Sequence, residues 1–465
     1  MKYSLRPYQQ TGVNQIRTAY SSGFHAPLYT LPTGGGKTIL YAFITESAAA
    51  KGNRVLILEH RQELITQASD KLSEIGVSHG IIAPGHSMTG DPVQVASVQT
   101  LVKRLDRMPE QDLIIIDEAH HSTAGSWSKI LKHFSTAKIL GVTATPARLD
   151  GKGLGQHCGG FFDTLIEGPS VRWLIDNGFL CQPVVYAPPT DFSTEGIRTI
   201  AGDFDKKEVN HRIDKPKITG CAIEHYKRLC PGVPALVFCA SIKHAEHVLQ
   251  QAREAGIASE IIDGTLSRQV RKHRIDALAS GALQWLVTVD VVSEGTDIPV
   301  VSAAILLRPT KSLGLYLQQV GRALRIYPGK TEAIILDHVG NCWRHGMPDD
   351  ERRWTLDGYR QKRRGKNAPG PDVKISMCKY CYAVFSAGAV KCPQCGMPVQ
   401  VNGREYKQVD GQLQKVSGTD KKEKQRKYTP TEYDRLRKCI AVAKSMGMSK
   451  QAAFRVFHRT KRSVA

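Results

Sequence analysis

The sequence predicts an α/β protein built from two parallel-sheet domains, followed by a small cysteine-rich module and a basic helical tail. Its 465 residues, 41% of them hydrophobic, are enough for two or three domain cores. Short apolar segments alternate with helical stretches twice along the chain, which is typical of parallel sheets covered by helices. No segment reaches about 18 consecutive apolar residues, and the first ten residues lack the apolar core of a signal peptide. We therefore expect a cytoplasmic protein that does not enter a membrane.

The two alternations divide the chain into expected domains. In the first, residues 1–170, strands are expected at 27–31, 55–58, 93–97, 113–116 and 139–142, with a helix at 38–48. Residues 171–215, which hold several prolines, glycines and charges, are expected to form a connector. In the second domain, residues 216–345, buried strands are expected at 235–238, 285–289, 303–307 and 333–336.

A glycine-rich segment after the first expected strand predicts a nucleotide site. Its backbone N–H groups can surround a polyphosphate, Lys37 can reach the β and γ phosphates, and the Thr38 hydroxyl can bind Mg²⁺. The strict phosphate-loop pattern has a glycine where this chain has Leu31, so the segment alone fits a glycine-rich turn at a helix start equally well. The residues expected to hold the nucleotide here are Thr33, Gly34, Gly35, Gly36, Lys37 and Thr38.

An acidic pair behind the apolar run 113–116 completes this prediction. The strand delivers the carboxylate of Asp117 to the Mg²⁺ that Thr38 also binds. Glu118 can orient and deprotonate the attacking water. The glycine-rich segment and the acidic pair together indicate hydrolysis of a nucleoside triphosphate.

The second expected domain has no phosphate loop of its own, so its simplest role is to serve the first domain's site across a cleft. Residues 318–325 contain Gln318, Arg322 and Arg325, and a helix here would put both arginines on one face. Two such guanidinium groups can stabilise charge that develops on a γ-phosphate, although solvated surface arginines are the simpler explanation of this segment alone.

Four of the eleven cysteines predict a structural metal site. Cys378, Cys381, Cys392 and Cys395 form two Cys-x-x-Cys pairs, and four thiolates complete a tetrahedral zinc site with no open position. Unliganded thiols or an iron–sulfur site are the alternatives. We expect this zinc module to occupy residues 376–400, after a basic linker at 346–375.

Positive charge is concentrated at the end of the chain. Residues 341–465 hold 28 of the 64 Lys and Arg residues but only 11 of the 43 Asp and Glu residues. Such a segment attracts a polyanion through release of counterions, which favours nucleic acid over a solvated surface or an anionic membrane. The tail at 401–465 is expected to be helical, either as a satellite helix pair or as a DNA-binding one.

The motifs taken together resemble those of the superfamily 2 helicases. They are the loop at 32–38, Asp-Glu-Ala-His at 117–120, Thr-Ala-Thr at 143–145, Ser-Glu-Gly-Thr-Asp at 293–297 and the segment 318–325. The resemblance covers about residues 3–345 and implies two RecA-like lobes that bind ATP and Mg²⁺ between them. It also implies a nucleic-acid-stimulated ATPase in which Lys37, Asp117, Glu118, His120, Gln318, Arg322 and Arg325 act in catalysis.

The same resemblance assigns roles to other residues. It implies that Gln9 reads the adenine edge with Arg6 near the ring, and that Gly295 and Asp297 contact the nucleotide from the second lobe. Thr143 and Thr145 would couple the phosphate site to a nucleic-acid groove. The residues expected to face the nucleic-acid backbone are Arg61, Gln99, Thr100, Thr265 and Arg271.

Within the superfamily, the segments 5–10, 308–310, 328–331 and 335–337 resemble the RadD-like bacterial repair helicases. This resemblance implies DNA in preference to RNA as the partner, a role in repair or recombination, and a bacterial or phage-encoded protein at the nucleoid. An RNA helicase and an ATP-switched nucleic-acid scaffold remain as alternatives, and a restriction-system motor is less consistent because no nuclease constellation follows the second domain. Protein partners, polarity and oligomeric state are not predicted.

Overall fold

A computed structural model describes residues 4–122, 125–148, 150–188, 197–200, 202–205, 208–209, 216–289, 298–357 and 375–399 of the protein. Residues 1–400 form one compact unit. Gly295 and Asp297, the expected basic tail and residues 358–374 of the expected basic linker lie outside the described residues.

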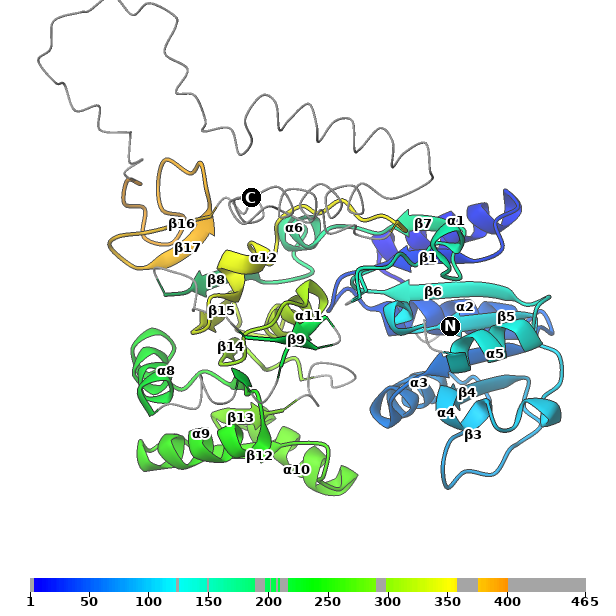
Figure 1. The fold of residues 1–465 in the computed structure, drawn as a ribbon, viewed down its shortest axis with the longest axis horizontal. Coiled ribbons are helices and arrows are strands. Elements are labelled where there is room, and N and C mark those ends of the chain that lie inside the picture. The colour runs from blue at the N-terminus through cyan, green and yellow to red at the C-terminus, as the bar shows by residue number, and fades with distance from the viewer. Residues whose placement is uncertain are drawn as a thin grey trace, which may run out of the picture. The chain divides into compact units, whose positions relative to one another are not determined.

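The first lobe is a sheet of seven parallel strands (Figure 1). In spatial order they are β3 (Gly80–Ile82), β4 (Val93–Ser97), β2 (Val55–Glu59), β5 (Leu113–Ile116), β6 (Lys138–Thr143), β1 (Pro27–Thr30) and β7 (Thr164–Glu167). Its helices and 3₁₀ turns are α1 (Pro7–Ser21), α2 (Lys37–Ala49), α3 (Gln62–Glu74), α4 (Val98–Leu101), η1 (Leu105–Arg107), η2 (Ala119–His121), α5 (Gly125–His133) and η3 (Gln156–Cys158). The five expected strands are confirmed to within one residue at each end, whereas β3 and β7 were not expected.

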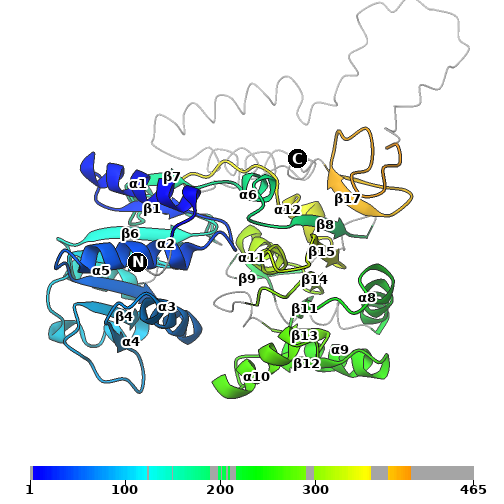
Figure 2. The same cartoon turned by 180° about the vertical axis from the view of Figure 1, so that it is seen from behind.

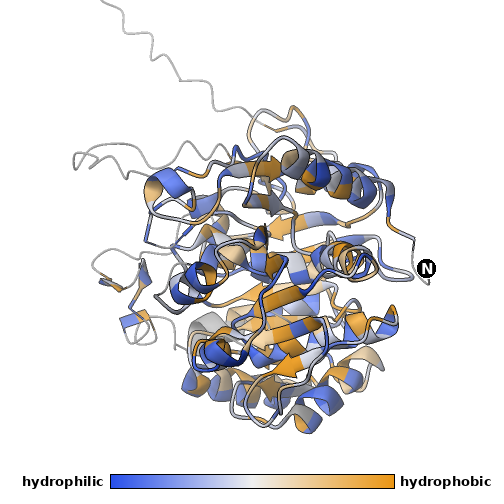
Figure 3. Cartoon of the chain, turned by 90° about the vertical axis from the view of Figure 1, so that its right-hand side faces the viewer, coloured by the Kyte–Doolittle hydropathy of each residue, from blue (hydrophilic) through white to orange (hydrophobic). Residues whose placement is uncertain are grey.

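Burial on both faces explains the apolar strands of this lobe. Along β2, Val55 and Ile57 pack into one hydrophobic cluster, and Leu56 and Leu58 pack into another on the opposite face. Successive side chains of a strand point to opposite faces, so a sheet covered on both sides needs apolar residues throughout. Figure 3 shows these hydrophobic strands inside the covering helices.

The second lobe is an eight-stranded sheet that is parallel over six strands. Its order is β12 (Ser259–Ile262), β13 (Trp285–Thr288), β11 (Ala235–Phe238), β14 (Ala303–Leu306), β15 (Glu332–Asp337), β8 (Gln182–Tyr186), β17 (Ala383–Ser386) and β16 (Ile375–Met377). The helices that accompany it are α6 (Val171–Asp176), α8 (Pro216–Leu229), α9 (Ile242–Glu254), α10 (Arg268–Ala279), α11 (Leu313–Ala323) and α12 (Asn341–His345). All four expected strands are present, which confirms the prediction of two parallel-sheet lobes.

Two segments outside the expected second domain belong to its sheet. The expected connector contributes β8, which pairs in parallel with β15, and the cysteine-rich module contributes β17, which pairs antiparallel with β8 (Figure 2). The connector also holds the small hairpin of β9 (Thr199–Ile200) and β10 (Asp203–Phe204). None of the helices among the described residues is long and apolar enough to cross a bilayer.

The two lobes meet where α11 packs on the first lobe. A Cβ at Gly321 would lie 2.7 Å from Thr33 Cβ, and a Cβ at Gly314 would lie 2.9 Å from Thr145 Oγ1. The two glycines are seven residues apart, so they share one helical face. Only glycine allows this approach of the helix backbone to the first lobe.

The chain returns to the first lobe after α12. The carbonyl oxygen of Leu356 accepts bonds of 3.0 Å from the N–H groups of both Leu154 and Gly155, and the Leu356 side chain packs on the first lobe's core. Asp357 then contacts His157, with 2.6 Å between Oδ1 and Nε2. This return segment therefore ties the end of the second lobe to the first.

A substitution at Gly141 would test how tightly the core of the first lobe is packed. A Cβ there would lie 2.4 Å from Phe162 Cε1 and 2.7 Å from Leu28 Cδ1, both in the core. We expect Gly141→Ala to lower the free energy of unfolding by about 1–3 kcal/mol, as overpacked cores do. Gly125→Ala is the control, because a Cβ there meets nothing within 4 Å. Urea unfolding measures both variants, and equal stability would contradict this account of the core.

Candidate functional site

A cavity of about 410 Å³ lies between the lobes. This volume falls within the roughly 300–1,000 Å³ of small-molecule sites. The expected site residues that line it are Arg6, Gln9, Thr33, Gly34, Gly36, Lys37, Thr38, Asp117, Glu118, Arg322 and Arg325. The structure thus brings together residues that span more than three hundred positions of the chain.

The glycine-rich segment forms the tight loop between β1 and α2. Gly34 and Gly36 have φ values of 87° and 84°, in the left-handed region that glycine adopts without strain. A Cβ at Gly36 would lie 2.4 Å from Gln9 Nε2. Because α2 begins at Lys37, the loop delivers its backbone to the N-terminus of a 13-residue helix, where anions bind favourably.

Two side chains from α1 hold this loop. The Tyr8 hydroxyl donates a 2.8 Å bond to the carbonyl of Gly35, and Gln9 Nε2 donates bonds of 3.2 and 3.3 Å to the carbonyls of Gly35 and Gly36. Gln9 Oε1 accepts a 3.0 Å bond from the backbone N–H of Arg6. The amide of Gln9 thus braces the phosphate loop in this structure, and its expected contact with adenine stays a prediction.

Glu118, which lines the cavity, lies close to two basic side chains. Lys37 Nζ is 3.5 Å from Glu118 Oε1, and His120 Nδ1 is 3.4 Å from Glu118 Oε2. Its backbone has a φ of 45°, which is uncommon for a residue other than glycine and indicates local strain of the kind that gathers at functional sites. The backbone N–H of Glu118 donates a 2.8 Å bond to Asp117 Oδ1, which orients the Asp117 carboxylate.

A chain of polar contacts leads from Glu118 to the second lobe. His120 Nδ1 is 2.9 Å from Thr143 Oγ1, which accepts a 3.2 Å bond from the N–H of Thr145. Both threonines are fully buried. Thr145 Oγ1 is the atom that Gly314 of α11 approaches, so the contacts connect Glu118 to the interface between the lobes.

Arg322 and Arg325 reach the cavity from different secondary-structure elements. Arg322 lies in the last turn of α11, but the helix ends at Ala323, and Arg325 instead forms an isolated antiparallel bridge with Leu180. The expectation that both share one helical face is wrong for this reason, although both line the cavity. Gln318 is 3% exposed inside α11 and does not line it.

The residues expected to face nucleic acid lie at several places in the two lobes. Arg61 occupies the N-cap position of α3 without a side-chain capping bond, and Gln99 and Thr100 lie in α4. Thr265 donates from its backbone and hydroxyl to Asp263 Oδ1 at 2.8 and 2.6 Å. Arg271 forms an ion pair with Glu63 across the lobes. Although burial opposes it, this guanidinium lowers the pKa of Glu63.

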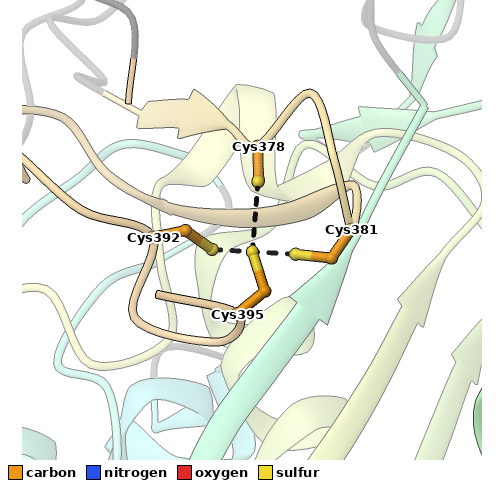
Figure 4. Close-up of side chains that lie close together, drawn as sticks. All are labelled: Cys378, Cys381, Cys392 and Cys395. Atoms are coloured by element: carbon orange, nitrogen blue, oxygen red, sulfur yellow. Dashed lines mark hydrogen bonds between the residues drawn. The ribbon is translucent and has the colours of Figure 1, made fainter. Parts of the chain in front are cut away.

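The four expected zinc ligands converge in the module (Figure 4). Their Sγ atoms all lie within 4.8 Å of one another. The Cys378–Cys395 and Cys381–Cys392 Sγ pairs are 3.6 and 3.7 Å apart. A tetrahedral site with Zn–S bonds of about 2.3 Å has sulfur–sulfur edges of about 3.8 Å, so the arrangement fits zinc. The backbone N–H of Tyr380 donates a 3.4 Å bond to Cys378 Sγ, which favours the thiolate form.

Sequence reasoning missed several residues around the cavity. Phe179 of the connector lines it, and the Arg6 guanidinium lies 5.1 Å from the centre of its ring. Tyr8 packs edge-to-face against Phe179 at 4.9 Å. A Cβ at Gly34 would lie 2.9 Å from Leu180 Cδ2. No local motif marks these connector residues, because only the fold brings them to the loop.

Two family descriptions match the chain. Residues 2–148 match the type III restriction enzyme res subunit, and residues 221–327 match the helicase conserved C-terminal domain. The two matches correspond to the two lobes and include the loop, Asp117, Glu118, Arg322 and Arg325.

Similar proteins come from phage, yeast and archaea. A 51.5 kDa protein of a Lactococcus phage is 32% identical over 81% of this chain and 79% of its own length. The candidate ATP-dependent helicase IRC3 of Saccharomyces cerevisiae is 29% identical over 72% of this chain, which spans 51% of that protein. A candidate DNA 3′–5′ helicase Rad25 of Halobacterium salinarum is 27% identical over 73% of this chain and 56% of its own length.

A solved structure shares the fold. The fragment of an HsdR subunit of a type I restriction enzyme from Vibrio vulnificus superposes with a TM-score of 0.58, at 23% identity, over 74% of this chain and 66% of that one. The likeness confirms the two-lobed α/β architecture.

Metal analysis tests the cysteine cluster. We expect one zinc per chain in the purified protein and loss of that zinc in Cys395→Ser, because three thiolates leave the tetrahedral site incomplete. Cys221→Ser, which removes a cysteine outside the cluster, is the control and should keep the metal. Iron in place of zinc, or full zinc in Cys395→Ser, would argue against a four-cysteine zinc site.

Proposed function

The chain belongs to the superfamily 2 helicases, and from this membership we propose that it is an ATP-hydrolysing motor that moves on DNA in repair or recombination. The observation that carries the proposal is the cavity between the lobes. Its lining joins a phosphate loop and two carboxylates of the first lobe to two arginines of the second. A site divided in this way couples the distance between the lobes to the state of the nucleotide.

The charged groups of the cavity have complementary roles in hydrolysis. Lys37, which lies 3.5 Å from Glu118 in this structure, would turn to the β and γ phosphates of ATP. Glu118 would then orient the attacking water and accept its proton. Arg322 and Arg325 would stabilise the charge that develops on the transferred phosphoryl group.

The first lobe offers a fitting set of oxygens for magnesium. Thr38 and Asp117 both line the cavity, and a hydroxyl with a carboxylate is typical of Mg²⁺ sites that also use substrate phosphates. Mg²⁺ bound there would neutralise charge on the β and γ phosphates. At the other end of the lining, Arg6, Gln9 and Phe179 offer a planar and polar surface for the adenine base.

The contacts between the lobes suggest how hydrolysis produces movement. The polar chain Glu118, His120, Thr143 and Thr145 ends at Gly314 of α11. A change at the γ-phosphate would therefore alter how closely α11 approaches the first lobe. Repeated closing and opening would shift a strand that Arg61, Gln99, Thr100, Thr265 and Arg271 hold by its phosphates and sugars, with little dependence on base sequence.

Similarity to proteins named for DNA or DNA repair favours DNA over RNA as the substrate. The Rad25 relative is named for a DNA substrate, and several segments resemble the RadD-like repair helicases. The zinc module and the basic tail would help to hold the strand, and a cytoplasmic, nucleoid-associated protein follows from this role. The match of residues 2–148 to the type III restriction enzyme res subunit supports a second candidate, the motor of a restriction system. An RNA helicase and an ATP-driven switch that grips without moving are the other outcomes to test.

ATP hydrolysis by the purified protein tests the proposal. We expect single-stranded, duplex or forked DNA to stimulate it more than RNA does, and Lys37→Ala to abolish it, because the lysine neutralises phosphate charge. The control is Lys51→Ala, an exposed lysine just past the end of α2. Stimulation by RNA alone would move the proposal to RNA, whereas hydrolysis that ignores every nucleic acid would contradict a nucleic-acid motor.

Glu118→Gln separates binding from hydrolysis. The amide keeps the shape of the side chain but cannot accept a proton, so kcat should fall by about 10²–10⁴-fold while ATP still binds. Nucleotide binding is measured by fluorescence anisotropy of a labelled ATP analogue and kcat by phosphate release. A variant with kcat unchanged would exclude Glu118 as the base.

A further inference from the structure

We propose that Lys330 is a positioning residue for hydrolysis, because its ammonium group fixes the backbone that carries Arg322 and Arg325 into the nucleotide cavity. The inference rests on the proposed ATPase and adds a residue that does not line the nucleotide cavity. Lys330 follows α11 in the turn before β15, where its N–H donates a 3.0 Å bond to the carbonyl of Tyr327.

The three N–H donors of the Lys330 ammonium match three backbone carbonyls. Lys330 Nζ donates to the carbonyls of Val301 and Arg325, each at 2.6 Å, and also to that of Ala323. Ala323 is the last residue of α11. Carbonyls at a helix end lack partners within the helix, and a cation there is favoured by the helix dipole. The lysine thus completes the end of α11 where the arginines leave it.

The same backbone is held from the other side by the connector. The N–H of Cys181 donates a 2.7 Å bond to the carbonyl of Leu324, and the side chain of the adjacent Leu180 packs close to Gly34 of the phosphate loop. Residues 323–325 therefore lie between Lys330 and the connector segment that contacts the loop. Loosening the Lys330 side of this arrangement should displace the two guanidinium groups relative to the phosphates.

The protonation state of Lys330 decides how many of the three backbone carbonyls it can bond. Burial lowers the pKa of Lys330 to about 8; the charge of Arg325 also lowers it, and the nearby Cys181 opposes the shift electrostatically. An ammonium has three N–H donors for three carbonyls, whereas the neutral amine has only two. One carbonyl loses its partner as the pH rises through about 8.

Deprotonation of Lys330 weakens the positioning of the arginines, but the same pKa shift acts on the stability of the fold in the opposite direction. The pKa is 10.5 without the protein environment and about 8 in the fold, so the unfolded chain binds more protons between these values. The contribution of Lys330 to the free energy of unfolding therefore rises in this range, while the positioning of the arginines is lost. A fall in activity there cannot come from unfolding driven by Lys330.

The test compares Lys330→Met with Lys243→Met, an exposed lysine in the first turn of α9. We expect Lys330→Met to lower kcat about tenfold or more at pH 7, with KM for ATP changed less than about threefold, because the arginines act mainly in the transition state. Lys243→Met should match the unsubstituted protein. Thermal unfolding of each variant separates this effect from loss of the fold.

The pH profile at saturating ATP is the second measurement. The unsubstituted protein and Cys181→Ser should lose kcat through about pH 8, and Lys330→Met should lack that step. Retention of full kcat in Lys330→Met, or absence of the step in the unsubstituted protein, overturns the inference. If Lys330→Met does not fold, the profiles of the other two proteins decide. A protein that hydrolyses no ATP at all contradicts the proposed function and the inference with it.

Discussion

The close approach of α11 to the phosphate loop is the constraint on which the site depends. Gly321 lies against Thr33, and Gly314 lies against Thr145, at distances that leave no room for a Cβ. On the α11 side this contact is made by helix backbone, and on the first lobe it is made by the short side chains of Thr33 and Thr145, so little slack separates the helix from the loop. Residues of both lobes line the cavity beside this contact, and the polar chain from Glu118 ends at Thr145, which the contact includes.

The phosphate loop is restrained from three sides, and a different part of the chain provides each restraint. Tyr8 and Gln9 bond its carbonyls from the N-terminal helix, Leu180 packs on it from the connector, and Gly321 packs on it from the second lobe. One continuous hydrophobic cluster, which includes Leu31, Leu180 and Leu324, runs through both lobes at this point. The site is therefore a product of the whole two-lobed unit.

Local sequence signals predicted the parts of the structure that depend on local chemistry. Runs such as residues 113–116 are apolar because both faces of their sheet are covered, so their strands could be placed to within one residue. The cysteine spacing likewise encodes two tight turns. The partners of β8, the end of α11 before Arg325 and the roles of Phe179 and Lys330 could not be read in this way, because each depends on contacts between distant segments.

The cysteine-rich module is joined to the second lobe by strand pairing, since Ala383 and Val384 of β17 pair with Tyr186 and Val185 of β8. Ser386 adds a 3.1 Å bond to Asp350 of the return segment. A shared sheet does not bend easily at one ladder of hydrogen bonds, so the module and the lobe should turn as one body. Any rotation of the second lobe would therefore carry the four-cysteine cluster with it as a rigid extension of the sheet.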